Sequence, residues 1–242
     1  MKRIASILLV VLMMASLLLT GCGKKDAAEP AASENAAAAP SAEANNTAAD
    51  ADDFAYITDK GTLTIGITIY DPMNYYDDNG KLVGFDTEFA EAVCEELGIK
   101  PEFVEINWDT KEIELADKQI DCIWNGLTIT EERKENMDFS DSYIKNMQVM
   151  VINKANADKF TDTASLADAT VVAEVSSAGE TAIAEDENLS KATYVSVPKQ
   201  TDALLEIKSG TADAAVLDYT LAKSMVGEGT DYSDLMLVPD VE

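Results

Sequence analysis

The chain alternates strand-like and helix-like patterns twice in succession, and this alternation constrains its fold more than any other feature of the sequence. Residues 62–69 alternate polar and apolar side chains with a period of two, which predicts a strand with one buried face. Two more strands are predicted at 103–106 and 120–124, each preceded by a helical pattern, at 86–97 and 110–117. The first half therefore follows the order strand, helix, strand, helix, strand.

The second half repeats this alternation. The expected strands are at 148–152, 170–175, 193–197 and 212–217, and the expected helices are at 178–184 and 202–209. Two α/β units of about ninety residues each predict two lobes, the first over 53–146 and the second over 147–238. We expect the chain to cross from one lobe to the other between Ile144 and Val151.

The helix expected over 86–97 carries the clearest end signals of the chain. Its apolar side chains recur at helical spacing and are expected to form the buried face, namely Phe89, Ala92, Val93 and Leu97. Asp86 is expected to be the N-cap, and Gly98 stands just past the last turn, where glycine commonly ends a helix.

The N-terminus has the pattern of an export signal. A basic pair precedes an apolar run from Ile4 to Leu19, which is shorter than the ~20 residues that a membrane-spanning helix needs. The run ends in Leu-Thr-Gly-Cys, which resembles the lipobox of bacterial lipoproteins. The resemblance implies a leader over 1–21 that is removed and a lipid on Cys22. Ordinary secretion with a leftover cysteine is the alternative.

The segment after the leader has no side chains that could form a core. Residues 26–52 are dominated by Ala, Glu, Asn, Ser and Pro and contain no aromatic or branched aliphatic residue. We therefore expect a disordered tether, which together with Cys22 makes a linker over 22–52. A tether of this length spans roughly 30 Å, so it would hold the lobes near a membrane without fixing their orientation.

Composition excludes several classes of function. The formal net charge of −27 repels nucleic acid and anionic lipid head groups, so neither is expected as a ligand. The chain has no histidine, which excludes zinc sites and Ser-His-Asp or Cys-His catalysis in their usual forms. Cys94 and Cys122 could pair in an oxidising compartment, but two free thiols are favoured. No cofactor or metal is expected.

Arg133 is the only arginine after the leader, against fifteen lysines. A planar guanidinium can grip a carboxylate through two parallel hydrogen bonds, whereas a lysine suits an ordinary surface position. Thr128 and Thr130 offer hydroxyl groups, and a helix start at Glu131 would direct backbone N–H groups toward the same anion. The segment is therefore a candidate carboxylate site. A structural salt bridge of Arg133 to one of the many acids is the alternative.

Two aromatic residues follow predicted strands of the first half. Tyr70 comes just after the strand at 62–69, and Trp108 just after the strand at 103–106. Because α/β proteins open their ligand crevices at such strand ends, we expect both side chains to wall an apolar slot. Core packing is the alternative for each.

Polar residues follow two strands of the second half. Asp218 directly follows the apolar strand at 212–217, so its carboxylate could hold an ammonium group, cap a helix beginning at Tyr219, or do both. Ser176 and Ser177 follow the strand at 170–175 and offer hydroxyl and amide donors in a strand-to-helix turn.

Three motifs carry a family resemblance. They are Gly84-Phe85-Asp86, the run Asp-Cys-Ile-Trp-Asn-Gly-Leu-Thr-Ile-Thr-Glu-Glu-Arg at 121–133, and Phe139-Ser140-Asp141-Ser142-Tyr143. Together they resemble the polar amino-acid solute-binding proteins of ABC importers, family 3, and the resemblance covers about residues 54–240. It implies the type II periplasmic-binding-protein fold, in which two α/β lobes joined by crossing strands close on the ligand like a hinged trap.

The resemblance also implies a function and a site. It implies a receptor rather than an enzyme, lipid-anchored outside the cytoplasm, that delivers an amino acid to the membrane subunits of an importer. In the family an arginine, a threonine and backbone amides grip the ligand α-carboxylate, and an acid of the second lobe receives the α-ammonium. These roles fall by position on Arg133, Thr128 and Gly126 for the carboxylate, Asn125 on the same wall, Asp218 for the ammonium, Trp108 and Tyr70 as aromatic walls, and Ser176 and Ser177 as amide donors.

The sequence departs from the family pattern in two places. Many relatives carry an aspartate where this chain has Thr68, so the ammonium contact rests more heavily on Asp218. The chain ends at Glu242, where relatives return to the first lobe. We therefore expect a C-terminally truncated fold in which 239–242 begin the return crossover.

Two other functions share the expected fold, because fold alone does not decide function. A dehydratase-like enzyme would use a carboxylate as general acid or base, with Glu174 as the leading candidate. An extracytoplasmic sensor domain would normally be fused to a membrane-spanning signalling segment. For a receptor, Glu174 and Asp71 near the expected cleft would favour a ligand with a cationic side chain.

Overall fold

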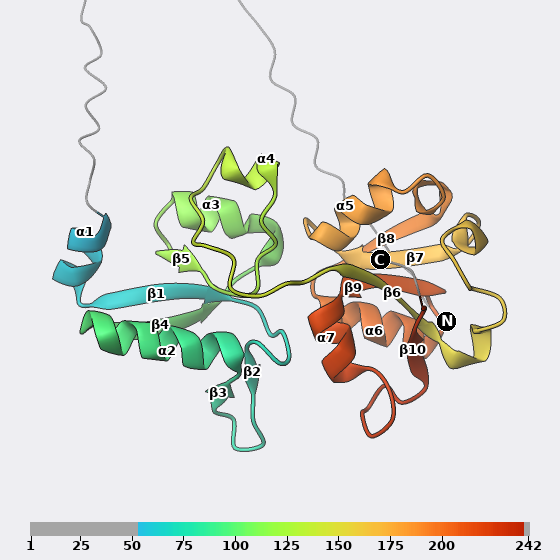
Figure 1. Ribbon diagram of the computed structural model, residues 1–242, viewed down its shortest axis with the longest axis horizontal. Coiled ribbons are helices and arrows are strands. Elements are labelled where there is room, and N and C mark those ends of the chain that lie inside the picture. Colours follow the sequence, from blue (N-terminus) through green and yellow to red (C-terminus); the bar gives the residue numbers. More distant parts are fainter. Residues whose placement is uncertain (1–52, 240–242) are drawn as a thin grey trace, which may run out of the picture. The chain divides into compact units, whose positions relative to one another are not determined.

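The computed structural model describes residues 53–239 (Figure 1). Within them, a three-stranded and a five-stranded sheet, each with its helices, form the first and the second lobe, so the expected two-lobed α/β fold is present. No helix in this part of the chain is long and apolar enough to span a membrane. The predicted leader over 1–21, the lipidation site Cys22, the linker over 22–52 and residues 240–242 lie outside the described residues.

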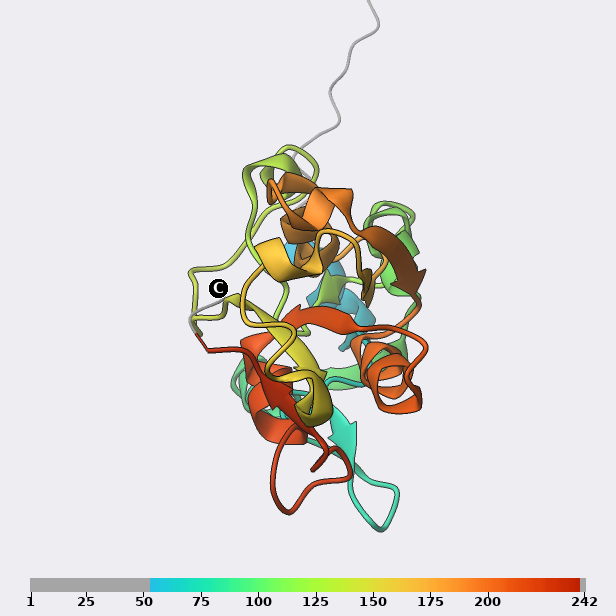
Figure 2. The same cartoon turned by 90° about the vertical axis from the view of Figure 1, so that its right-hand side faces the viewer.

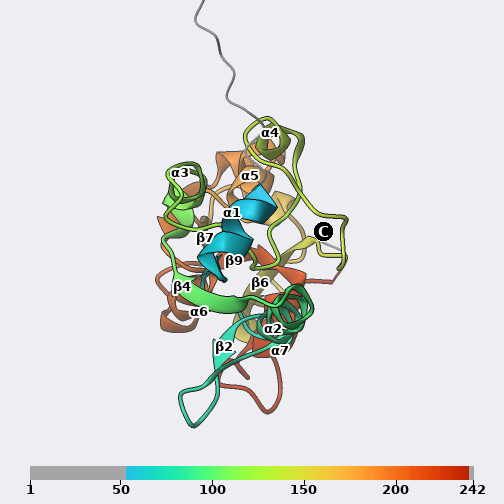
Figure 3. The same ribbon diagram turned by 90° about the vertical axis from the view of Figure 1, so that its left-hand side faces the viewer.

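The sheet of the first lobe has the order β4-β1-β5, and all its strands are parallel. The central strand β1 (Thr62–Ile67) pairs with β4 (Lys100–Glu105) on one side and with β5 (Cys122–Ile123) on the other. Helix α2 (Phe85–Leu97) contacts β4, as Figure 3 shows, and α3 (Lys111–Ala116) contacts β5. Parallel strands joined through helices are the arrangement that the alternating pattern predicts.

The first lobe also contains elements that the periodicity does not predict. They are helix α1 (Asp53–Lys60) and a hairpin of β2 (Tyr75–Tyr76) with β3 (Leu82–Val83). Strands of two residues are too short to show a period, so the pattern carries no signal for them. The helix start expected at Glu131 is confirmed by the short helix α4 (Glu131–Lys134).

The second lobe is built on a five-stranded sheet of order β10-β6-β9-β7-β8 (Figure 2). The strands are β6 (Gln148–Asn153), β7 (Thr170–Glu174), β8 (Thr193–Val197), β9 (Ala214–Asp218) and β10 (Leu235–Leu237). Strand β7 is parallel to β8 and β9, whereas β6 is antiparallel to β9 and β10. Three helices connect them, α5 (Ala178–Glu185), α6 (Gln200–Ser209) and α7 (Tyr219–Met225).

Each face of this sheet has its own hydrophobic core. Val151 of β6 belongs to the cluster that contains Leu204 of α6, and its neighbour Ile152 belongs to the cluster that contains Ile183 of α5. Successive side chains of a strand point to opposite faces, so helices on both sides bury the whole sheet. The carboxyl ends of β7 and β9 are thereby held in a fixed place.

Strand β1 is buried on both faces, although the alternating pattern predicted one. The polar Thr64 is only 8% exposed, in the same range as its apolar neighbour Leu63 at 8%. The cause is the position of β1 between two parallel partners, because parallel sheets are normally covered on both sides.

Helix α2 turns a different face to the core than its apolar pattern predicted. Its buried residues are Asp86, Thr87, Ala90 and Cys94, and none of Phe89, Ala92, Val93 and Leu97 is buried. Phe89 is 37% exposed and packs edge-on against Trp124, with 5.3 Å between the ring centroids. Small side chains face the sheet, and the aromatic side chain lies along an apolar groove at the surface.

Asp86 does not cap helix α2, contrary to expectation. The N-cap is Gly84, whose φ is 123°, and a Cβ built there would stand 2.3 Å from the carbonyl oxygen of Met73. Only glycine tolerates such a close approach, so Gly84 occupies the N-cap position. The helix therefore begins at Phe85, one residue earlier than expected. The Asp86 carboxyl group is buried instead, and burial raises its pKa to about 6. Gly98 ends the helix at a φ of 70°, as predicted.

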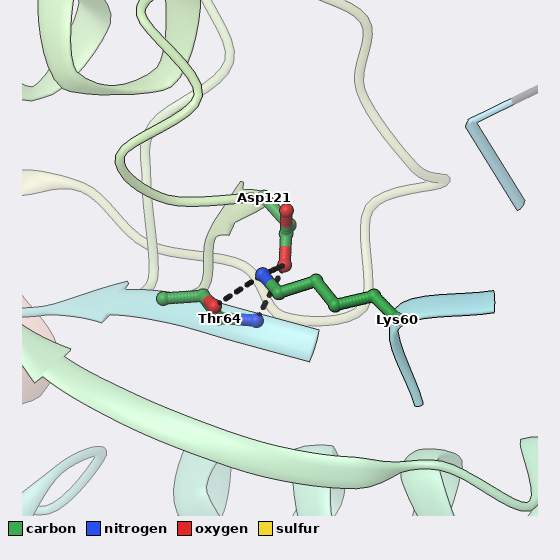
Figure 4. Close-up of polar contacts among 3 residues, drawn as sticks. All are labelled: Lys60, Thr64 and Asp121. Atoms are coloured by element: carbon green, nitrogen blue, oxygen red, sulfur yellow. Dashed lines mark hydrogen bonds and ion pairs between the residues drawn. The ribbon is translucent and has the colours of Figure 1, made fainter. Parts of the chain in front are cut away.

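Lys60, Thr64 and Asp121 join the start of β1 to the segment before β5 (Figure 4). The Lys60 ammonium donates to the Asp121 carboxylate at 2.8 Å, and the backbone N–H of Thr64 donates to the same oxygen at 2.6 Å. Burial acts to raise the pKa of Asp121, but these hydrogen bonds outweigh it and lower the pKa below its ordinary value. The carboxylate thus stays charged and holds the start of the motif at 121–133 in place.

Cys94 and Cys122 are both free thiols, the state that the sequence favoured. Cys94 belongs to the apolar core of the first lobe, and the partly buried Cys122 packs against it. Burial raises the pKa of the Cys122 thiol to about 12, so this thiol is uncharged at neutral pH and a poor nucleophile.

Candidate ligand-binding site

A cavity lies between the two lobes, beyond the carboxyl ends of β1, β7 and β9. Its walls are formed by Thr68, Ile69, Tyr70, Trp108, Asn125, Gly126, Thr128 and Arg133 of the first lobe and Glu174, Ser177, Ala178, Gln200, Asp218 and Leu221 of the second. Eight of the nine ligand-binding residues predicted from the sequence line it, and Ser176 does not. That each of them binds a ligand stays a prediction.

Arg133 is buried in the wall of the first lobe, at 8% exposure. Thr130 is the N-cap of α4 and accepts the backbone N–H of Arg133 at 3.2 Å, which fixes where the side chain starts. Its guanidinium donates to the carbonyl oxygens of Thr128 at 2.7 Å and Ser176 at 3.1 Å. No carboxylate among residues 53–239 forms an ion pair with it, so the alternative of a structural salt bridge finds no support.

Asp218 faces the cavity from the second lobe, at the end of β9. Its carboxylate accepts three amide N–H groups, from Asn146 at 2.5 Å, Gln148 at 2.7 Å and Gln200 at 2.5 Å. The residue occupies the N-cap position of α7, but its side chain makes no capping hydrogen bond. The charge is therefore held by neutral donors and has no cationic partner in the described part of the chain.

Tyr70 and Gly126 meet in the first-lobe wall. A Cβ built on Gly126, whose φ is 60°, would stand 2.9 Å from the Tyr70 ring, so glycine lets the ring lie against the backbone. Tyr70 also belongs to the apolar cluster of the second lobe, so it combines the core packing and cavity roles. Burial, and after it the charge of Asp218, raises the pKa of Tyr70 well above its usual value.

Asn125 lines the cavity, but hydrogen bonds within the protein occupy its amide group. Its Nδ2 donates to the carbonyl oxygen of Thr68 at 2.9 Å and to Asn74 at 2.7 Å, and its Oδ1 accepts the Thr68 hydroxyl at 2.7 Å. Thr68 thus completes a buried polar network with Asn74 and Asn125.

Trp108 is 7% exposed and carries a lysine against its ring. The ammonium of Lys111 lies 4.8 Å from the ring centroid and donates to the carbonyl oxygens of Trp108 at 3.0 Å and Ser176 at 2.9 Å. Burial, and after it the charge of Arg133, lowers the pKa of Lys111 to about 8. Nothing in the spacing of Lys111 along the chain distinguishes it from a surface lysine, so its burial could not be predicted.

The turn between β7 and α5 joins the two lobes through Ser176. Its carbonyl oxygen accepts from both Arg133 and Lys111, and its hydroxyl donates to the Asp109 carboxylate at 2.7 Å. Its backbone N–H donates to Glu180 at 2.6 Å. Ser176 is therefore directed to protein partners. Its neighbour Ser177 lines the cavity and caps α5, accepting the backbone N–H of Glu180 at 3.2 Å.

Ser176 adopts a φ of 55°, a left-handed conformation that favours glycine. We expect Ser176→Gly to unfold at a higher urea concentration than Ser176→Ala, by about 1 kcal/mol in unfolding free energy. Both variants lose the hydroxyl contact with Asp109, so the difference isolates the backbone term. An alanine variant as stable as the glycine variant would contradict this assignment of strain.

Glu174 and Gln200 line the cavity without having been among the predicted ligand-binding residues. Glu174 is the last residue of β7 and is 3% exposed. The sequence indicates Glu174 as an acid near the expected cleft, although the strand predicted over 170–175 runs one residue beyond it. Gln200 is the first residue of α6. Glutamine is an ordinary helix residue, because its straight side chain loses little rotamer freedom in a helix, so nothing in the sequence marks it as a site residue.

Comparison of the sequence with protein-family models identifies the family of the chain. Residues 63–225 match the family model of bacterial extracellular solute-binding proteins, family 3. The chain belongs to this family. The family 3 resemblance inferred from the motifs is thereby confirmed.

Among family 3 relatives, the L-cystine-binding protein TcyA of Bacillus subtilis (strain 168) is 32% identical over 160 residues. That match covers 65% of this chain and 53% of TcyA, so the chain spans about half the length of this relative. The ABC transporter glutamine-binding protein GlnH of the same organism is 26% identical over 239 residues, covering 96% of this chain and 80% of GlnH.

Solved structures share the fold. The arginine-bound form of a truncated ArgBP from T. maritima has a TM-score of 0.70 and 32% identity, covering 78% of this chain and 85% of that chain. An ancestral amino acid-binding protein, AncCDT-1, described as a precursor of cyclohexadienyl dehydratase, has a TM-score of 0.67 and 36% identity. That match covers 70% of this chain and 75% of that chain.

Proposed function

We propose that the protein captures a free amino acid in the cavity between its lobes and presents it to an ABC importer. One observation carries the proposal: a buried guanidinium and a buried carboxylate, Arg133 and Asp218, face one cavity from different lobes, and neither forms an ion pair within residues 53–239. Buried charges are normally paired, so both groups favour a partner from outside. The α-carboxylate and α-ammonium of an amino acid supply the two partners.

The proposed capture makes and breaks no covalent bond. Arg133 would bind the ligand carboxylate with support from Thr128 and Gly126, Asp218 would bind the ammonium, and Trp108 and Tyr70 would pack on the ligand. Hydrogen bonds to charged groups contribute about 1.5–3 kcal/mol each, and micromolar affinity corresponds to about 8 kcal/mol. A few such bonds therefore suffice, and the relatives named for L-cystine, glutamine and arginine support this ligand class.

We further propose that the mature protein is lipid-anchored at Cys22 on the outer side of the cytoplasmic membrane. The family of extracellular solute-binding proteins supports the compartment. The lipobox-like ending and the polar composition of 26–52 support an anchored, tethered receptor that reaches the importer's membrane subunits. Mass spectrometry of the protein isolated from membranes would reveal the lipid on Cys22, and a mature N-terminus elsewhere would contradict the anchor.

A carboxylate-dependent enzyme on the same scaffold is the second candidate. Its support is the buried Glu174 in the cavity wall together with the likeness to a binding protein described as a dehydratase precursor. An enzyme would convert its ligand, whereas a receptor would release it unchanged.

A thermal-shift screen of the mature protein against the common amino acids tests the proposal. A ligand at about a thousand times its Kd stabilises by about 4 kcal/mol, which for a domain of this size corresponds to a rise in Tm of roughly 10 °C. We expect such a rise with one chemical class of amino acid and recovery of that ligand unchanged after incubation. Conversion of the ligand would favour the enzyme, and absence of any shift would reject amino-acid capture.

A further inference from the structure

Glu174 is a buried carboxyl group in the cavity wall that has no partner in the proposed capture. It ends β7 at 3% exposure, beside Asp218 and Gln200 in the lining. Gln200 donates to the Asp218 carboxylate at 2.5 Å, and all three residues line the second-lobe part of the cavity. No lysine or arginine among the described residues forms an ion pair with Glu174.

Each charged group around the cavity can be compared with the partner that the protein or the proposed ligand offers it. A ligand carboxylate would balance Arg133, and a ligand ammonium would balance Asp218. Lys111 is held by two carbonyl oxygens and a ring face, and does not line the cavity. Of the carboxyl and guanidinium groups that line the cavity, Glu174 is the one for which the proposed capture supplies no partner, so its carboxyl group is available to a positive group of the ligand.

Burial, and after it the negative charge of Asp218, raises the pKa of Glu174 to about 8. Asp202 acts in the same direction, whereas Lys111 acts in the opposite direction, and Arg133 also lies within electrostatic range. The Glu174 carboxyl group therefore holds a proton at neutral pH. A cation placed beside it would lower its pKa and expel that proton.

We propose that Glu174 selects the ligand side chain, so that the amino acid captured is one with a cationic side chain. This inference rests on the proposed function, because it presupposes that Arg133 and Asp218 engage the α-groups. The side-chain cation would meet a carboxylate inside a buried site, where a charge-assisted hydrogen bond is stronger than in water. A neutral side chain of the same shape would leave Glu174 protonated and gain no such bond.

L-arginine and L-citrulline form a matched pair of probes, because they share shape and α-groups and differ in side-chain charge. Titration calorimetry on the full mature chain should show that L-arginine binds at least about tenfold more tightly than L-citrulline. The isosteric variant Glu174→Gln should bring the ratio of the two affinities close to one. The control variant Glu187→Gln removes an exposed acid of the second lobe and should leave the ratio unchanged.

Proton release supplies a second measurement that needs no variant. Titrations at about pH 7 in buffers of different ionisation enthalpy should show close to one proton released per L-arginine bound and none per L-citrulline. Since binding releases a proton, the affinity for L-arginine should rise with pH up to about 8.

The possible results separate this inference from the proposed function. Equal affinity for both probes, an unchanged ratio in Glu174→Gln, or exclusive binding of a neutral amino acid would overturn the selection by Glu174 while leaving amino-acid capture intact. Failure to bind any amino acid would overturn both.

Discussion

Replacing Arg133 with lysine is expected to reduce ligand affinity by more than about a hundredfold while leaving the protein folded. An ammonium retains the charge but lacks the planar fork, so it cannot hold the carbonyl oxygens of Thr128 and Ser176 and still present two parallel N–H groups to a carboxylate. Hydrogen bonds to charged groups contribute about 1.5–3 kcal/mol each, so losing the two parallel bonds corresponds to more than about a hundredfold in affinity. Titration calorimetry with the ligand from the thermal screen measures this loss.

Lys134→Arg is the matched control for this substitution. Lys134 is the next residue of the same helix, its side chain is 49% exposed, and it forms a surface ion pair with Glu131. Exchanging lysine and arginine there should change affinity by less than about twofold, because surface ion pairs contribute little. Unchanged affinity in Arg133→Lys would mean that the guanidinium does not hold the ligand.

Asp218→Asn is expected to cause a comparable loss of affinity, accompanied by a fall in stability. The charge that would balance the ligand ammonium disappears. The three amides of Asn146, Gln148 and Gln200 would then face a side chain that is half donor instead of two acceptor oxygens. Leaving one or more of these donors unsatisfied costs about 1–3 kcal/mol, which urea unfolding would detect.

Asp231→Asn makes the same change of charge at an exposed position of the second lobe and should alter neither property. Circular dichroism distinguishes loss of binding from loss of fold in Asp218→Asn. If the variant binds with wild-type affinity, the ammonium lies elsewhere and the assignment of Asp218 is wrong.

The sequence was sufficient for the order of strands and helices and for the ends of strands at which the cavity opens. Strand periodicity located β8 to the residue, and the strand-end rule placed Tyr70, Trp108 and Asp218 around one cavity. Both inferences depend only on the order of residues along neighbouring positions, and that order can be read from one sequence.

Where the sequence misled, tertiary packing had overridden a local pattern. Phe89 reads as core at helical spacing, yet Ala90 and Cys94 lie against the sheet because small side chains permit close approach. Likewise, the burial of Lys111 and the role of Ser176 depend on carbonyl groups that come together only when two distant turns meet. The spacing of residues along the chain does not predict these contacts between distant turns.

The three amides that hold Asp218 have a consequence for how occupancy is communicated. Asn146 belongs to the stretch leading into β6, Gln148 begins that strand, and Gln200 begins α6. A carboxylate offers about four acceptor sites, so a ligand ammonium bound to Asp218 would share its oxygens with these three amides. Asn146, which does not line the cavity, also accepts the backbone N–H and the hydroxyl of Thr220. Under the proposed function, a ligand ammonium at Asp218 would therefore perturb hydrogen bonds of the segment that leads into β6, and a shift of the Asn146 amide resonance on adding ligand would report it.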